Sequence, residues 1–156
     1  MKPKPQFIRE GDWFAVPLET GGYAIGVVAR KSKGGVLLGY FFGPRREKVP
    51  TIEDTKDLSV HGAVLVGRFG DLSLRDRTWP LLGPRPGWVR EEWPMPRFGR
   101  VEPYANRGWI VIYGDDPSDV IREERCSMED ASKLLPDRLA GAGAVEFRLT
   151  KLLAKT

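Results

Sequence analysis

The stretch Trp13-Phe14-Ala15-Val16-Pro17-Leu18-Glu19-Thr20-Gly21-Gly22-Tyr23-Ala24-Ile25-Gly26-Val27-Val28-Ala29 decides the fold, because it sets two short apolar runs around a glycine pair. Two more runs of strand length, 36–42 and 63–69, lie beyond further glycines. Short runs rich in Val, Ile, Tyr and Phe, punctuated by turn residues, are typical of β-strands. Because several runs are apolar at successive positions, both faces of the sheet must be covered. We therefore expect a curled antiparallel sheet or a partly open barrel.

The second half of the chain predicts further strands and short helices. The segments 109–113 and 120–126 have strand character, and Ser127 followed by Asp130 resembles a capped helix start whose length Pro136 limits. Residues 144–154 leave two alternatives open. Leucines and a valine at helical spacing favour an amphipathic helix, whereas the alternation of apolar and polar residues from Val145 to Thr150 would suit a strand. The predicted class is α+β, mainly β, with one or two short helices toward the C-terminus.

Length and composition predict one water-soluble domain. A chain of 156 residues with 41% hydrophobic and 29% charged residues has the usual size and balance of a single folded domain, here 1–156 with a flexible segment at 1–6. No apolar run approaches the roughly 20 residues of a membrane span, and the basic start of the chain lacks the apolar core of a secretory signal. Cys126 is the single cysteine, which suits a reducing compartment. We expect a cytoplasmic protein that does not bind the membrane.

The residues that usually carry catalysis or bind metals are few. His61 is the single histidine; a Ser–His–acid system is conceivable, but a histidine that starts a strand and caps a turn is the simpler interpretation. Neither metal-ligand spacing nor a phosphate-binding glycine motif is present in the sequence, so we expect no metal and no cofactor. Adjacent Glu91 and Glu92 are a weak carboxylate pair, and Asp115-Asp116 before a proline reads as a solvated turn. A small hydrolase with an unrecognised carboxylate pair remains a third hypothesis; we expect that the chain is not an enzyme.

Nucleic-acid binding is the main alternative function. The formal charge is +4, and the segment 71–100 combines arginines with tryptophans and prolines. Stacking on aromatic rings and neutralisation of phosphates need those two residue types. Arginine and tryptophan are also enriched at the energetic centres of protein–protein interfaces. The pattern therefore predicts an ordered, irregular binding segment and leaves both partner classes open.

The start of the chain resembles a known family. The motif Glu10-Gly11-Asp12-Trp13-Phe14-Ala15-Val16-Pro17-Leu18, the glycine-bearing run Gly22-Tyr23-Ala24-Ile25-Gly26-Val27-Val28 and the aromatic Tyr40-Phe41-Phe42 look like the immunity protein 26 family of bacterial polymorphic-toxin systems. Trp79 and Trp93-Pro94 are similar to later tryptophan positions of that family. We interpret the motif residues as parts of the fold: Gly11-Asp12 as a turn, Pro17 as a strand end, and Gly26 as a place where another backbone approaches.

The resemblance implies a cytoplasmic antidote that binds and neutralises a cognate protein toxin without catalysis. For the partner-binding surface we single out exposed parts of the segment 84–100, and within it Trp88, Arg90, Glu91, Glu92 and Arg97. Aromatic and arginine side chains on a proline-stiffened segment lose little entropy on binding. The alternative is that Trp79, Trp88 and Trp93 belong to the core.

Overall fold

The computed structural model describes residues 4–154 and is built mainly of strands. The strands are β1 (Asp12–Pro17), β2 (Tyr23–Lys31), β3 (Val36–Arg46), β4 (Leu65–Gly70), β5 (Leu81–Pro84), β6 (Phe98–Glu102), β7 (Arg107–Tyr113), β8 (Val120–Cys126), β9 (Leu135–Pro136) and β10 (Leu139–Ala140). The helices are α1 (Leu72–Arg75), α2 (Met128–Ser132) and α3 (Ala142–Leu153), with 3-10 turns at Ile52–Thr55, Val60–Gly62, Arg90–Glu92 and Pro103–Ala105. The predicted mainly β class with short helices toward the C-terminus is confirmed.

A six-stranded sheet forms the larger part of the molecule, in the order β10-β4-β3-β2-β1-β5, and does not close into a barrel. Its ladders are antiparallel except for the short parallel pairing of β10 with β4. The predicted meander corresponds to β1–β4, turned by glycines such as Gly21 and Gly22, whose φ angles of +94° and +82° suit glycine.

Both faces of this sheet are buried, as the continuous apolar runs predicted. On one face the side chains of Phe14, Phe41 and Phe69 pack with Trp79 and with α3. On the other face Trp13, Ile25, Tyr40 and Phe42 form a second cluster. Successive residues of a strand point to opposite faces, so one apolar strand supplies both clusters.

Gly26 makes room for a side chain and not for a backbone, so our expectation at this position was wrong. Phe14 lies directly opposite Gly26 in the β1–β2 register. A Cβ atom built on Gly26 would lie 2.4 Å from Cζ of the Phe14 ring. The ring also stacks on Trp79 at a centroid distance of 5.7 Å. Glycine therefore serves here to admit the aromatic ring into the core.

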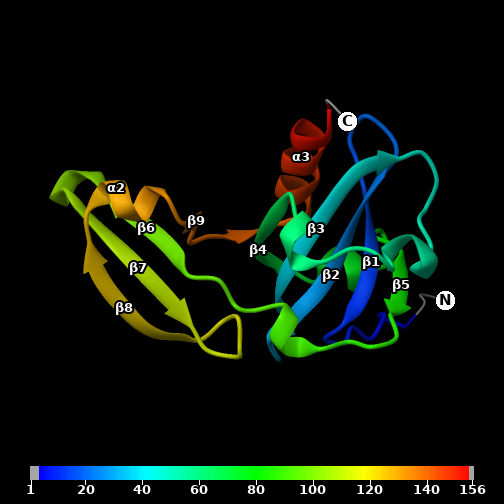
Figure 1. Cartoon of the computed structure of the whole chain (residues 1–156), viewed down its shortest axis with the longest axis horizontal. Helices are drawn as coiled ribbons and strands as arrows, with labels where there is room; N and C mark the ends of the chain where they lie inside the picture. Colours follow the sequence, from blue (N-terminus) through cyan, green and yellow to red (C-terminus); the bar gives the residue numbers. More distant parts are fainter. Residues whose placement is uncertain (1–3, 155–156) are drawn as a thin grey trace.

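A four-stranded sheet, in the order β8-β7-β6-β9, lies beside the larger one (Figure 1). Helix α2 packs on β6 and β7 so closely that Cβ atoms on Gly99 and Gly108 would lie 2.0 Å from the Ala131 carbonyl oxygen and 2.2 Å from that of Ser127. The opposite face contributes Phe98 and Val111 to the cluster that contains Trp13 and Trp93. The two sheets thus share one core.

The open alternatives in the second half are resolved. Residues 142–153 form a helix that buries Val145, Leu149 and Leu153, while the side chain of Leu152 is 45% exposed. Ser127 caps α2, its side chain accepting a hydrogen bond from the Asp130 N–H, as predicted. Two local expectations were wrong in part. His61 lies in a 3-10 turn before β4, and the segment 71–100 contains α1 and the edge strand β5.

The expected flexible start, 1–6, is only partly described, since residues 1–3 lie outside the described residues. Gln6 donates its backbone N–H to the Arg75 carbonyl at 2.9 Å. Among residues 4–154, no helix has the length and apolar character needed to cross a membrane.

Candidate partner-binding surface

Arg90 is held in place from two sides. Its Nε lies 2.5 Å from Glu10 Oε1, just before β1, and its Nη1 lies 3.2 Å from Asp115 Oδ1, in the turn between β7 and β8. The hydrogen bond to Glu10 raises the pKa of Arg90 above its ordinary value. Glu10 also lies 3.6 Å from Nη1 of the buried Arg30, whose pKa is lowered by burial. This Glu10–Arg30–Arg90–Asp115 network fixes the segment that carries Arg90 against both sheets.

The Trp88 side chain packs on the buried ring of Trp93. It stacks on Trp93 with a centroid distance of 5.6 Å and an interplanar angle of 11°, and a Cβ atom built on Gly11 would lie 3.2 Å from Cγ of its ring. Trp93 is 1% exposed and packs edge-on against Trp13 at 5.7 Å. Trp88 itself is half-buried. Trp79 and Trp93 are therefore core residues, and Trp88 is the tryptophan of this segment that reaches the surface.

The remaining selected residues differ in their surroundings. Glu91 and Glu92 are exposed, and within the described chain neither carboxylate forms an ion pair. Arg97 is exposed and lies 3.3 Å from Glu124 on β8. The structure thus gathers Trp88, Arg90, Glu91 and Glu92 in one short segment, and places Arg97 at the border of the smaller sheet.

His61 lines a pocket together with Ser59 and Glu92, next to Trp93. A nucleophile–base pair needs hydrogen bonds of about 2.6–3.2 Å between its members. No such bond joins these three side chains in the part of the chain that the structure describes. A serine, a histidine and a glutamate thus line the same pocket, but their side chains do not form the hydrogen bonds of a catalytic triad. Between residues 4 and 154 there is also no group of three or more His, Cys, Asp or Glu side chains positioned to hold a metal ion.

The alternation of arginine with aromatic residues does not produce an open stacking platform. Trp79, Trp93 and Phe98 are each at most 1% exposed. Arg85 lies over the Trp13 ring at 4.5 Å and donates to the Leu58 carbonyl at 3.0 Å. These groups stabilise the fold, so base stacking within the segment 71–100 would have to rely on Trp88.

Sequence reasoning missed a second polar network, which joins the two sheets. Tyr113 on β7 donates to Asp137 Oδ1 at 2.5 Å, and Arg68 on β4 lies 3.2 Å from the same oxygen. Arg100 on β6 lies 3.7 Å from Asp137 Oδ2 and 2.8 Å from Glu123. Burial, followed by the bond to Asp137, raises the pKa of Tyr113 to about 12. No local pattern marks these residues, because they lie on four separate strands and on the connection between β9 and β10.

The family model described as immunity protein 26 matches residues 9–110 of the chain. The chain belongs to this family. No curated protein and no solved structure matches it. The match covers β1–β6 and part of β7, whereas β8, α2, β9, β10 and α3 lie beyond it.

The motif residues that resemble the immunity protein 26 family have structural roles in the core and in the turn before β1. Asp12, Trp13 and Phe14 are at most 1% exposed, and β1 ends at Pro17. The Asp12 carboxylate accepts the Arg9 N–H at 2.8 Å and so closes the turn into β1. The family motif therefore specifies the sheet, and the partner-binding residues must be sought on the surface around it.

Proposed function

We propose that this protein is the immunity component of a bacterial polymorphic-toxin system, which binds a cognate protein toxin in the cytoplasm and neutralises it without catalysing a reaction. The observation that carries the proposal is the immunity protein 26 match over residues 9–110. Immunity by binding requires a stable recognition surface and no reactive group of its own.

The surface formed by Trp88, Arg90, Glu91 and Glu92 supports this proposal. A half-buried tryptophan on an aromatic base and an arginine clamped by two carboxylates lose little conformational entropy when a partner binds. The carboxylates of Glu91 and Glu92 are exposed and without ion pairs in the described chain, so they are available to a basic partner. We assign this surface to toxin binding.

Co-expression with the product of the adjacent upstream reading frame tests the function. We expect the wild-type chain to restore growth and to co-purify with that product. Failure of both would contradict the immunity function.

A pair of charge reversals tests the surface. Glu91→Lys should weaken the complex at least about tenfold, because a charged hydrogen bond at an interface is worth roughly that factor or more. The matched control is Glu47→Lys, which makes the same charge change at an exposed position on another part of the surface. Equal affinities for the two variants would contradict the assignment of the surface and leave the function itself intact.

A salt series separates the toxin complex from nucleic-acid binding. Neutralising several phosphates releases counterions, so affinity for DNA or RNA falls by about 10³-fold or more between about 50 and 200 mM salt for six or more contacts. A mixed protein interface should lose far less affinity over that range. Steep loss with a DNA duplex, together with tighter binding to it than to the co-expressed protein, would favour the alternative.

A further inference from the structure

The outer edge of β4 is only partly covered. Strand β10 pairs with β4 opposite Arg68 and Phe69 alone. The β3–β4 register is regular, and the Asp71 N–H donates to the Gly35 carbonyl at 2.9 Å at its end. Alternate residues of an antiparallel strand direct their backbone groups to opposite sides. Asp71 faces β3, so every second residue back along β4, including Gly67 and Leu65, also faces β3. Val66 lies between those two and therefore directs its N–H and C=O away from β3. No strand within residues 4–154 pairs with Val66 on that side.

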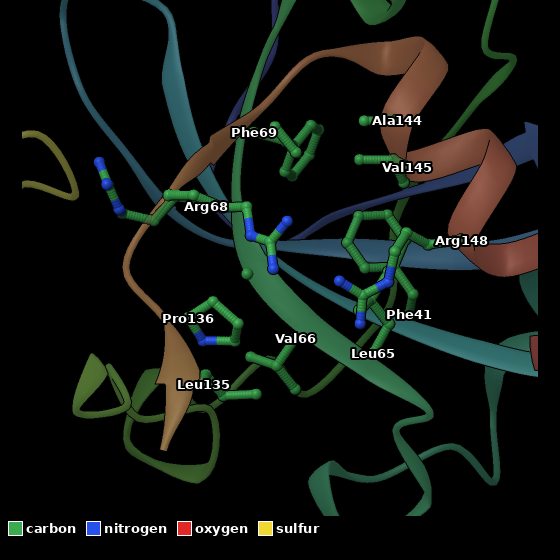
Figure 2. Close-up of a pocket in the computed structure, with 13 residues that line it drawn as sticks. Phe41, Leu65, Val66, Arg68, Phe69, Leu135, Pro136, Ala144, Val145 and Arg148 are labelled. Carbon is green, nitrogen blue, oxygen red and sulfur yellow. The ribbon is translucent and has the colours of Figure 1, made fainter. Parts of the chain in front are cut away.

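An apolar pocket surrounds this open edge (Figure 2). On the α3 side of β4 it is lined by Phe41, Leu65, Phe69 and Val145, and on the other side by Val66, Leu135 and Pro136. Gly67 lies in the middle, and a Cβ atom built on it would meet no heavy atom within 4 Å. The pocket thus offers space on both faces of the strand, next to the outward-directed backbone groups of Val66, with which no described strand pairs.

Two arginines at this pocket form no ion pair with any residue that the structure describes. Arg138 and Arg148 line it and are exposed, and among the described residues neither forms an ion pair. Figure 2 shows Arg148 extending from α3 at the edge of the pocket. Arg68, by contrast, is paired with Asp137. The free charge at the pocket is therefore positive, which selects an acidic occupant.

The outer edge of β8 is protected in a way that the edge of β4 is not. Strand β8 ends the smaller sheet and carries Arg122, Glu123, Glu124 and Arg125. Charged side chains on an edge strand discourage pairing with another chain. The edge of β4 that β10 leaves uncovered, in contrast, is the half-buried apolar sequence Leu65-Val66-Gly67. The edge of β8 therefore discourages pairing with another chain, whereas the edge of β4 permits it.

We propose that the open edge of β4 binds a short extended segment of the toxin, which carries an apolar side chain and a carboxylate nearby. The segment adds to the sheet through the Val66 N–H and C=O, inserts its apolar side chain beside Gly67, and pairs its carboxylate with Arg148 or Arg138. The side chains of an extended chain alternate between the two faces of a sheet. Such a chain fits here because the pocket has space on both faces of β4. This inference rests on the proposed function and adds a second contact region, separate from Trp88 and its neighbours.

Affinity for the co-expressed, catalytically inactivated product of the adjacent upstream reading frame tests the inference. Gly67→Trp fills the pocket from a position with free space, and Arg148→Glu reverses the unpaired charge. We expect each variant to weaken the complex at least about tenfold. The matched control Arg125→Glu makes the same charge change on β8, at an exposed arginine without an ion pair in the described chain, and should stay close to the wild type. Circular dichroism and thermal unfolding of each variant establish that it is folded.

The outcomes separate this inference from the function. If the wild type fails to bind or protect, the immunity function fails. If the wild type binds and the folded Gly67→Trp and Arg148→Glu variants bind equally well, the function stands and the β4 site is wrong. Sedimentation of the protein alone gives a second criterion: a dimer that Gly67→Trp dissociates would mean that a second copy of the chain occupies the edge, and would overturn the assignment to the toxin.

Discussion

At the scale of single residues, two glycines of the larger sheet stand in opposite surroundings. Gly26 on β2 lies under the Phe14 ring, whereas Gly67 on β4 borders open space. The same residue type therefore has a packing role at one position and leaves a gap at the other. Replacement of each by alanine distinguishes the two roles.

Gly26→Ala should lower the free energy of unfolding by about 1–3 kcal/mol, because the added methyl group overpacks the core against Phe14 and Trp79. Gly67→Ala should change the free energy of unfolding by no more than about 0.5 kcal/mol, as for most surface substitutions. Urea unfolding followed by circular dichroism measures both values. A Gly26→Ala protein as stable as Gly67→Ala would show that the Phe14 ring moves aside without cost.

At the scale of elements, the short helix α2 depends on its cap and on two glycines beneath it. Five residues cannot form a stable helix by themselves, so α2 draws its stability from packing on β6 and β7. The Ser127 hydroxyl accepts the Asp130 N–H at 3.0 Å and satisfies one of the free donors at the helix start. The acidic residues Glu129 and Asp130 lie in the first turn, where the helix dipole favours them.

Ser127→Ala should destabilise the protein by about 1 kcal/mol, the usual cost of losing a helix N-cap. Ser132→Ala is the matched control, because Ser132 lies at the other end of α2 and its hydroxyl donates only to the Glu129 carbonyl. It should change the free energy of unfolding by less than half as much. Chemical denaturation of both variants checks the difference, and equal effects would argue against a capping role for Ser127.

At the scale of the whole molecule, the two sheets are joined by an apolar cluster and by the Arg68–Asp137–Tyr113 network. Phe98 and Val111 of the smaller sheet pack in the same cluster as Trp13 and Trp93 of the larger one. We therefore predict that the chain unfolds as one unit, with coincident transitions by tryptophan fluorescence and far-UV circular dichroism. Two separate transitions would show that the sheets are independent domains.

The junction also predicts a dependence of stability on alkaline pH. The pKa of Tyr113 is raised from 10.0 to about 12 in the folded protein, so between these values the folded state retains a proton that the unfolded chain has lost. The stabilisation by neutral Tyr113 is complete below pH 10 and is lost as pH rises toward 12, by about 2–3 kcal/mol. Tyr113→Phe should remove this loss, whereas Tyr104→Phe, at a fully exposed tyrosine, should not. Unfolding free energies measured at several pH values between 9 and 12 test it, and equal slopes for wild type and Tyr113→Phe would contradict it.

The sequence alone determined the strand meander, the cap of α2 and the family. These features depend on neighbours along the chain: the alternation of side chains in a strand, the glycines that permit a turn, and a serine before a helix with a donor three residues later. For α3 the spacing of Val145, Leu149 and Leu153 favoured a helix but left a strand open, and the structure, in which a helix buries these three residues, decided between the two. Local chemistry is sufficient to predict a structural feature when the interacting groups are close in sequence.

Only the tertiary structure decided which side chains of the segment 84–100 reach the surface and where the pocket on β4 forms. Trp88 and Trp93 look alike in sequence, and their different burial results from the packing of Trp13 and Phe42 around Trp93. The sequence predicted Arg90 as a partner contact without indicating its pairing with Glu10, which lies 80 positions away. The β4 pocket likewise combines Phe41 with residues as distant as Arg148. Such contacts depend on the combined packing of elements far apart in the chain, and no local pattern specifies them.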